Sequence, residues 1–482
     1  MIRTRFAPSP TGYMHIGNLR SALYAFLYAR HTGGRFLLRI EDTDLERYVD
    51  GAVDVIYRTL KDVGITWDEG PDIGGDFGPY VQSERKAMYL PFAEQLVRSG
   101  HAYRCFCTKE ELDARREEAA ARGETFRYDK HCLNLSEEEI REKMEAGVPY
   151  VIRQNIPMEG QTSFTDEIFG TITVDNSTLD DNVLIKADGM PTYNFANVID
   201  DHTMGITHVM RGMEYLSSTP KYNLLYEAFG WEIPKYIHMT PIMKDAQHKL
   251  SKRNGDASYE DFISKGYLKE AVINYIALLG WNPGDEREIF SMDELIEAFS
   301  LEGMSKSPAI FDPQKLLWMN FAYVRALPPE TFTEYAAPYY EEAGIGDMDR
   351  EILCRILQPR VEIFSQIPEM VGFLAELPEY DTELFTNKKS KTDSEISAAV
   401  LDIVIPALEG LEDWTEESLH NTLIGIAEQR GMKNGTVLWP VRIAMAGKQV
   451  TPGGAIEIGL LLGKDETLRR LHIGRKKLKD AE

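Results

Sequence analysis

The sequence predicts an α/β fold that is interrupted by an insertion and followed by an all-α C-terminal region. Three observations predict it: a strand–helix–strand unit over residues 2–40, a highly charged helical pattern over 105–147, and the near absence of strand patterns after about 325. Strand patterns return after the charged stretch, which therefore separates two halves of one nucleotide-binding fold. The 482 residues exceed the usual length of one domain, in agreement with two to four domains.

The first unit begins with a strand over Ile2–Ala7, which ends at a stretch rich in proline and glycine. A helix follows over 17–32, because apolar residues recur there at spacings of three and four, at Leu19, Leu23, Phe26 and Leu27. Arg35–Ile40 forms the second strand. So tight a connection predicts a right-handed parallel crossover.

Ligands of such sheets bind beyond the carboxyl ends of the strands. That rim would carry the turn Pro8–Asn18 and the acidic cluster Glu41–Asp44. An isolated acidic cluster is commonly a solvated turn, so for this one both a solvated turn and a ligand contact stay open.

Within the insertion we expect helices over Lys109–Arg122 and 136–145, the second opened by a Ser136–Glu139 capping box. Short antiparallel strands are expected near 150–153 and 170–174. Strand-and-loop sequence is expected from Pro191 to Arg211, and a helix over 268–279.

The composition limits location and partners. No apolar run approaches the roughly 18 residues that span a bilayer, and the N-terminus lacks a signal-peptide core, so we expect a cytoplasmic protein without a membrane partner. A net charge of −24, from 53 Lys and Arg against 77 Asp and Glu, argues against sequence-blind binding to nucleic acid. A nucleic-acid enzyme with local basic strips stays compatible with this charge.

Neither G-x-x-x-x-G-K-[ST] nor G-x-G-x-x-G occurs in the chain. A different phosphate site is predicted in the turn Pro8–Asn18, where Gly17 opens a helix and backbone N–H groups face the rim. His15 can donate a hydrogen bond to phosphate oxygens there. A lone histidine before a glycine would otherwise be only a helix cap.

A second basic motif lies far along the chain, at His248–Arg253. Lys249 and Lys252 are three residues apart with Ser251 between them, an arrangement that suits a clamp on a polyphosphate. Alone, such a charge run would be a solvated surface loop.

Together these motifs carry a resemblance. His15–Asn18 resembles the HIGH motif and Lys249–Arg253 the KMSKS motif of class I aminoacyl-tRNA synthetases. The resemblance extends to the glutamyl-tRNA synthetase family over nearly the whole chain, and a helical C-terminus implies its bacterial type. Further matching stretches are Arg5–Gly12, Arg39–Asp44, Tyr80–Arg85, Pro191–Asn194, Arg211–Glu214, Phe229–Trp231 and Leu462–Lys464.

The resemblance implies ATP-dependent attachment of glutamate to tRNA(Glu) through a glutamyl-adenylate, with Mg²⁺ accompanying ATP. Because no covalent enzyme intermediate is needed, positioning and charge stabilisation would supply catalysis. His15 and Lys252 would stabilise the transition state, and Lys249 is a weaker candidate. The implied ATP-binding residues are Ser9, His15, Gly17, Asn18 and Lys252.

Glutamate presents two carboxylates, so its pocket needs more than one cation or strong donor. The resemblance implies Arg5 and Arg211 as the amino-acid-binding arginines. It implies Glu41 as the partner of the α-amino group, with polar contacts from Tyr193 and Asn197. Met213 departs from the family, many members of which carry an acidic residue at this position.

Cys105, Cys107 and Cys132 match the C-x-C-x24-C part of a zinc-binding insertion seen in some members. Those members carry a histidine two residues after the third cysteine, where this chain has Asn134. His131 or Tyr128 would then supply the fourth ligand of a structural Zn²⁺, and reduced cytosolic thiols are the alternative. Cys354 is expected to be an ordinary buried cysteine.

The resemblance divides the chain into five parts and implies a monomer. The helical C-terminus would bind the anticodon, where Arg360 aligns with a base-contacting arginine and is otherwise an ordinary surface arginine. The parts are a catalytic domain over 1–100 and 191–240, an inserted α+β acceptor-binding domain over 101–190, a stem-contact region over 241–330 that carries the KLSKR loop, and the anticodon-binding region over 331–482.

Four alternatives remain. A non-discriminating enzyme would also charge tRNA(Gln) with glutamate, and a glutaminyl enzyme is disfavoured by the helical C-terminus. A relative that modifies a tRNA base would lack the residues after about 330. An inactive tRNA-binding scaffold is opposed by His15, Lys252, Arg5 and Glu41, all of which are present.

Overall fold

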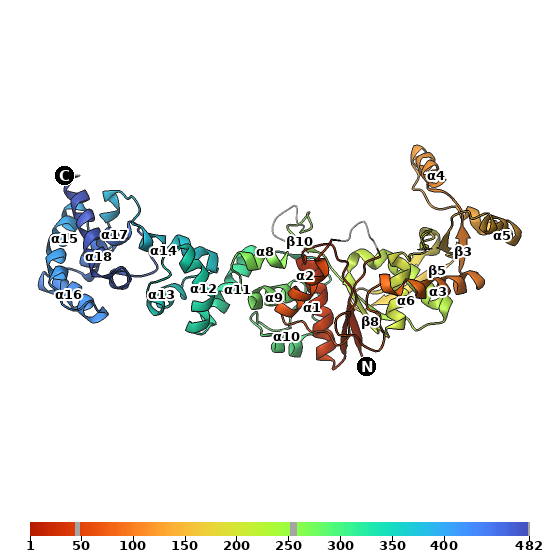
Figure 1. The fold of residues 1–482 in the computed structure, drawn as a ribbon, viewed down its shortest axis with the longest axis horizontal. Helices are drawn as coiled ribbons and strands as arrows, with labels where there is room; N and C mark the ends of the chain where they lie inside the picture. Colours follow the sequence, from red (N-terminus) through yellow and green to blue (C-terminus); the bar gives the residue numbers. More distant parts are fainter. Residues whose placement is uncertain (44–48, 251–257, 481–482) are drawn as a thin grey trace. The chain divides into compact units, whose positions relative to one another are not determined.

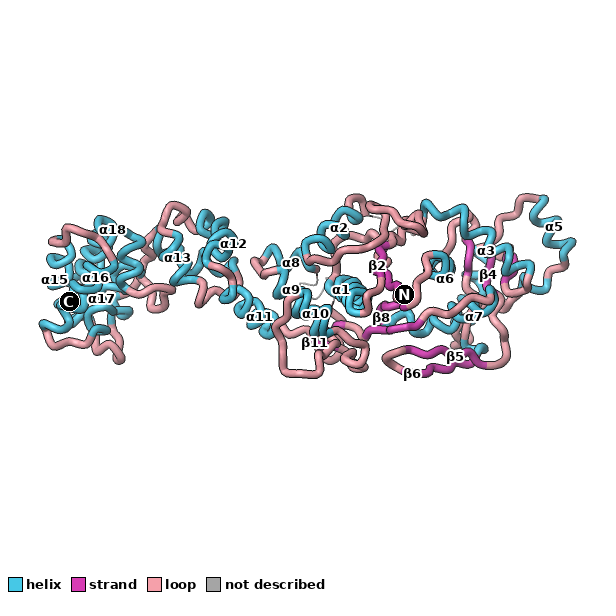
Figure 2. Tube along the Cα trace, turned by 90° about the horizontal axis from the view of Figure 1, so that it is seen from below, coloured by secondary structure: helices cyan, strands magenta, loops and turns pink. Residues whose placement is uncertain are grey.

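The computed structural model describes residues 1–43, 49–250 and 258–480. It divides into two compact units, one of Met1–Phe262 with Val272–Asp312 and one of Ile263–Ala271 with Pro313–Glu482. Figure 1 follows the chain through both units, and Figure 2 shows that the strands belong to the first. No described helix combines the length and the hydropathy that crossing a membrane requires.

The predicted strand–helix–strand unit is confirmed. Strands β1 (Arg3–Phe6) and β2 (Arg35–Leu38) pair in parallel, and helix α1 (Ile16–His31) connects them. The apolar side chains whose spacing predicted the helix are buried: Leu19, Leu23, Phe26 and Leu27. They cover the sheet and leave the N-terminal end of α1 at the rim beyond the strands.

Two further sheets follow. Strands β3 (Ala102–Cys105), β4 (Val151–Gln154) and β7 (Val183–Ile185) form one antiparallel sheet. The hairpin of β5 (Gln161–Asp166) and β6 (Gly170–Asp175) joins the other, where β5 and β8 (His208–Gly212) both run parallel to β9 (Lys235–Met239). Chain segments far apart in sequence thus share one sheet.

The insertion contains the two expected helices, α4 (Lys109–Ala121) and α5 (Glu137–Glu145), and Ser136 with Glu139 forms the predicted capping box. One expectation is wrong: the segment from Pro191 to Arg211, expected to be strand and loop, contains helix α6 (Tyr193–Thr203). Phe195, Val198 and Ile199 recur at helical spacing and are buried, which explains the helix.

The first unit contains one further strand pair and several further helices. Strands β10 (Ile242–Met243) and β11 (Ala309–Ile310) pair in parallel. The helices are α2 (Ala52–Asp62), α3 (Lys86–Arg98), α7 (Thr219–Phe229) and α10 (Met292–Ala298). Two more helices, α8 (Tyr259–Ser264) and α9 (Lys269–Leu278), have residues in both units.

The second unit is helical, as predicted. Its described residues form no strand, and their buried apolar side chains make one continuous core. The helices are α11 (Pro313–Ala326), α12 (Pro329–Glu342), α13 (Arg350–Leu357), α14 (Ile367–Ala375), α15 (Ser394–Glu409), α16 (Glu416–Gln429), α17 (Asn434–Ala446) and α18 (Ala455–Asp480).

A buried arginine holds three of these helices together. The Arg470 guanidinium in α18 donates to the backbone oxygens of Phe373 (2.6 Å), Leu374 (2.9 Å) and Met445 (2.9 Å), at the ends of α14 and α17. Carbonyls in the last turn of a helix have no partner within that helix. Arg470 supplies those partners, and Glu466 balances its charge at 2.6 Å.

Replacing Arg470 with methionine should therefore leave three buried carbonyls without donors. We expect Arg470→Met to lower the free energy of opening of α17 and α18 by about 3 kcal/mol, measured by native-state hydrogen exchange. The matched control is Arg469→Met, which removes an exposed partner of the same Glu466 and should cost less than about 1 kcal/mol. Equal losses in the two variants would contradict this role for Arg470.

Candidate active site

A cavity of about 180 Å³ opens beyond the carboxyl ends of β1, β2 and β8. Six of the residues singled out from the sequence line it: Arg5, Ser9, Asn18, Glu41, Tyr193 and Arg211. They come from β1, the turn before α1, the start of α1, the segment after β2, the start of α6, and β8. The tertiary fold thus gathers six distant positions around one space, at the rim where parallel strands place ligands.

His15 lies at the N-terminus of α1. Its Nδ1 accepts a hydrogen bond from the backbone N–H of Gly17 at 3.0 Å, so a neutral imidazole carries its proton on Nε2. A Cβ at position 17 would lie 3.2 Å from His15 Nδ1, which explains the glycine there. The histidine is therefore a helix cap and a potential Nε2 donor at once.

The described residues that follow the second signature lie against the first. Lys249 is exposed and pairs with Met243, outside the lining of the cavity. After the gap in the described chain, Ser258 pairs with His15, and the Tyr259 N–H donates to Met14 O at 3.0 Å. Lys252 itself lies outside the described residues. Of the described residues on either side of it, Ser258 and Tyr259 are held against the turn that carries His15.

A buried ion network forms the floor of the cavity. Asp201 accepts a two-pronged contact from Arg5, with Oδ1 to Nε at 3.0 Å and Oδ2 to Nη2 at 3.2 Å. Arg39 donates to the same Asp201 at 2.8 Å and to Glu41 at 2.9 Å. All four side chains are buried. The network ties β1, β2 and α6 together through charge-assisted hydrogen bonds.

Burial and the two arginines set the charge states of the carboxyl groups. Burial raises the pKa of Glu41, although Arg39 and Arg5 oppose it. Burial acts in the same direction on Asp201, but Arg5 and Arg39 outweigh it and lower the pKa of that carboxyl group. Asp201 is therefore the stronger anchor for Arg5.

The neighbouring Asp200 anchors a second set of side chains. It accepts hydrogen bonds from Arg85 (2.7 Å), Tyr89 (2.9 Å) and Gln82 (2.9 Å). Neither Asp200 nor Asp201 was identified from the sequence. An acidic pair inside the helical pattern of α6 was a usable signal, because charged residues on a buried helix face need partners.

Arg211 differs from Arg5 in having no carboxylate partner among the described residues. Its Nε donates to His238 Nε2 at 3.1 Å and its Nη2 to Thr219 Oγ1 at 2.9 Å. The guanidinium lies 4.9 Å from the ring centre of Tyr222 and 5.2 Å from that of Tyr215. A buried cation in a cavity wall, without an anion of the protein beside it, can bind an anionic ligand.

Asn197 lies beside the cavity without lining it. Its side chain is buried, and its Nδ2 donates to the Tyr193 carbonyl within α6 at 2.6 Å. Gly17, like His15, is also outside the lining. The structure therefore connects Asn197 to the cavity only through Tyr193, which lines it.

The three neighbouring cysteines come together around a tyrosine. Sulfur atoms of Cys105, Cys107 and Cys132 lie within 4.8 Å of one another. The Tyr128 hydroxyl is 3.2 Å from Cys105 Sγ and 3.4 Å from Cys107 Sγ, and it accepts from the Cys132 N–H. His131 lies outside this cluster. Hydrogen bonds from Cys132, Tyr128 and Arg153 outweigh burial and lower the pKa of the Cys105 thiol, whereas the hydrogen bond with Cys105 and burial raise the pKa of the Cys132 thiol.

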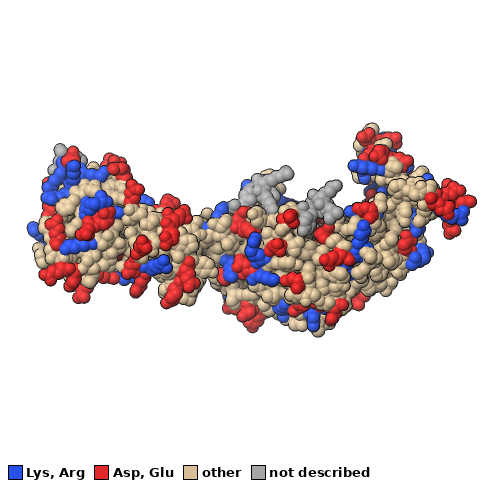
Figure 3. All heavy atoms as spheres, viewed as in Figure 1, with Lys and Arg blue, Asp and Glu red and all other residues tan. Residues whose placement is uncertain are grey.

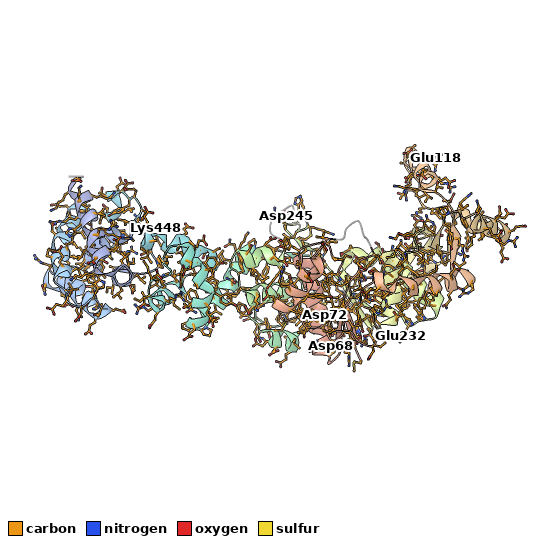
Figure 4. The ribbon with its side chains drawn as sticks, in the orientation of Figure 1. Asp68, Asp72, Glu118, Glu232, Asp245 and Lys448 are labelled. Atoms are coloured by element: carbon orange, nitrogen blue, oxygen red, sulfur yellow. The ribbon has the colours of Figure 1, made fainter. Side chains whose placement is uncertain are left out.

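In the second unit, Arg360 lines a cavity of about 480 Å³. Its Nη1 donates to Ile356 O at 2.8 Å, which fixes the side chain against α13. Lys448, labelled in Figure 4, lies in the same wall. Gln366, Glu369, Met370, Val450, Thr451 and Pro452 complete the lining. The cavity combines two cations and one carboxylate with small polar and apolar surfaces.

Two family models match the chain. One, described as tRNA synthetases class I (E and Q), catalytic domain, matches residues 1–318, and the other, an anticodon binding domain, matches 330–475.

Relatives that match over nearly the whole chain agree with both family models. A glutamate–tRNA ligase of Clostridium botulinum strain Hall is 61% identical over 99% of both chains, and one of Clostridium tetani is 59% identical over 99% of this chain and 98% of its own. The crystal structure of a glutamate tRNA ligase from Elizabethkingia meningosepticum, in complex with its amino acid, superposes with a TM-score of 0.90 at 36% identity, covering 99% of each chain. This chain belongs to the class I tRNA synthetases of the E and Q type.

Proposed function

We propose that this protein attaches L-glutamate to the 3′-terminal adenosine of tRNA(Glu), using ATP and releasing AMP and pyrophosphate. Relatives of near-equal length that are about 60% identical carry the name glutamate–tRNA ligase. One observation carries the proposal: Arg211, Glu41 and Arg5 line the same cavity. Arg211 is a buried cation there and has no carboxylate partner among the residues that the structure describes.

The charges of the cavity complement those of glutamate. Arg211 would bind one carboxylate as a guanidinium fork, and Arg5, two of whose donors are held by Asp201, would add a weaker contact. Glu41 would receive the α-ammonium group. Tyr193, which lines the cavity, would complete the polar wall, and Asn197, one turn later in α6, would support it through the Tyr193 carbonyl.

Two bond exchanges follow. A glutamate carboxylate oxygen attacks the α-phosphorus of ATP, and the bond to pyrophosphate breaks to give glutamyl-adenylate. The 2′-hydroxyl of the terminal adenosine then attacks the acyl carbon, loses its proton and displaces AMP. Ser9, Gly17 and Asn18 would hold the nucleotide. His15 and Lys252, with Lys249 as a further candidate, would stabilise charge on the phosphate oxygens. Mg²⁺ enters with ATP as part of the substrate.

The remaining parts would hold the tRNA. We assign acceptor binding to 101–190, stem contact to 241–330 and anticodon binding to 331–482, with Arg360 beside an anticodon base. In Figure 3, Lys and Arg are interspersed with Asp and Glu on the visible face of each unit. With a net charge of −24, this distribution supports tRNA affinity that is modest, salt-sensitive and concentrated at a few basic sites.

The cysteine cluster fits a structural Zn²⁺. Three thiols and one phenol hydroxyl converge from β3, the segment after it and the turn before α5, a four-donor set that suits tetrahedral coordination. Of the two candidates for the fourth ligand, Tyr128 lies among the sulfur atoms and His131 does not. The ion would link the start of the charged insertion to the segment between its two helices.

Aminoacylation tests the proposed function. Purified protein with ATP should attach glutamate to tRNA(Glu) and should not attach glutamine, because Arg211 pairs with a carboxylate better than with an amide. Charging of tRNA(Gln) with glutamate would reveal a non-discriminating enzyme. An absence of charging of either tRNA would favour the inactive scaffold.

Substitution of Lys252 tests its assignment to the transition state. We expect Lys252→Ala to lower the rate of glutamyl-adenylate formation about 100-fold and to change the KM for glutamate less than about threefold. Rapid-quench measurement of adenylate in the presence of tRNA separates the two effects. Comparable losses in rate and in glutamate affinity would contradict the assignment.

Metal analysis tests the zinc site. Protein purified without chelator should contain close to one equivalent of zinc, and Tyr128→Phe should weaken zinc binding at least about tenfold in a chelator competition. The control His131→Asn, at an exposed position three residues away, should bind zinc as the unmodified protein does. Less than about a tenth of an equivalent in the unmodified protein would refute the site.

A further inference from the structure

We propose that Asp166 and His238 are positioning residues that hold the Arg211 guanidinium in the orientation required for the glutamate carboxylate. This inference rests on the proposed function of Arg211. It assigns a role in the pocket to a strand of the 101–190 segment, because Asp166 ends β5.

The three side chains form a continuous chain of hydrogen bonds across neighbouring strands. Arg211 on β8 is paired in register with His238 on β9, and β9 runs parallel to β5, which ends at Asp166. Asp166 Oδ2 lies 2.7 Å from His238 Nδ1, and His238 Nε2 lies 3.1 Å from Arg211 Nε. The Asp166 and His238 side chains are fully buried.

The surroundings of Asp166 determine which imidazole nitrogen carries the proton. Its Oδ1 accepts from the backbone N–H groups of Ile168 and Phe169, both at 2.9 Å, and its Oδ2 also accepts from the His238 N–H at 3.0 Å. These donors hold Asp166 as a carboxylate, which can only accept. His238 must therefore donate through Nδ1–H, and its Nε2 is left to accept from Arg211.

The consequence for Arg211 is geometric. Nε is held by His238 and Nη2 by Thr219 Oγ1, so the plane of the guanidinium is fixed from two sides. No described residue accepts a hydrogen bond from Nη1, and Arg211 lines the cavity. The fork is thus fixed before the substrate binds, so little rotamer entropy is lost on binding.

A neutral imidazole is essential to this arrangement. Burial, aided by the nearby Arg211 and opposed by Asp166, lowers the pKa of His238. A protonated ring would turn an N–H toward the N–H of Arg211, so that two donors would face each other. The same conflict follows if the proton of the neutral ring moves from Nδ1 to Nε2.

Two histidine substitutions separate positioning from packing. The side-chain oxygen of His238→Gln can accept from Arg211 at the place of Nε2, whereas His238→Asn reaches only to the place of Nδ1. We expect His238→Asn to raise the KM for glutamate about 10- to 100-fold, as loss of an orienting partner does, and His238→Gln to restore most of the affinity. The KM for ATP should change less than about threefold in both variants.

Asp166→Asn tests the proton arrangement directly. Its amide would donate to Nδ1 and force the ring proton onto Nε2, opposite Arg211. We expect the KM for glutamate to rise by a similar factor. We also expect the ¹⁵N chemical shifts of His238 to show the ring proton on Nε2 in this variant and on Nδ1 in the unmodified protein.

The outcomes are distinct. Failure of the unmodified protein to charge tRNA with glutamate would refute the proposed function, and the positioning role with it. Normal charging with an unchanged KM for glutamate in His238→Asn and Asp166→Asn would overturn the positioning role alone. Parallel rises in the KM for glutamate and ATP, or an unmodified His238 protonated on Nε2, would also overturn it.

Discussion

The active site depends on the carboxylate of Asp201, which lies between the guanidinium groups of Arg5 and Arg39. Buried charges are costly unless they are paired and hydrogen-bonded, so these side chains cannot move independently. Asp201 comes from α6, Arg5 from β1, and Arg39 from the residue after β2. The network therefore holds three chain segments at the distances that create the cavity, and Glu41 is held through Arg39.

The same network makes the two pocket arginines chemically different. Arg5 is neutralised by Asp201, whereas Arg211 faces aromatic rings, a neutral imidazole and a hydroxyl group. A buried cation without a counterion favours an anion from solution. In the proposed function, selectivity for an acidic amino acid would depend on the absence of a described carboxylate partner for Arg211 as much as on the presence of the arginine itself.

The segment 101–190, to which acceptor binding is assigned in the proposed function, makes structural contacts near both of its ends. Near its start, the cysteine cluster organises the charged helices, which have few buried apolar side chains of their own. Near its end, β5 joins the sheet of β8 and β9 and places Asp166 behind His238. An insertion that binds tRNA would thereby share a sheet with the amino-acid pocket, which gives a rigid path between the two.

The sequence by itself determined the features that depend on residues close together in the chain. Apolar spacing predicted α1, a highly charged helical pattern predicted α4 and α5, and the near absence of strand patterns predicted the helical second unit. The motifs around His15 and Lys249 indicated the family. The tertiary structure decided the side-chain contacts between residues that are distant in the chain. These are the pairing of Asp201 with two arginines, the Asp166–His238–Arg211 chain, and the choice of Tyr128 over His131 beside the cysteines. The physical reason is that periodicity reports which face of an element is buried, whereas the partner of a buried charge is set by how the elements pack.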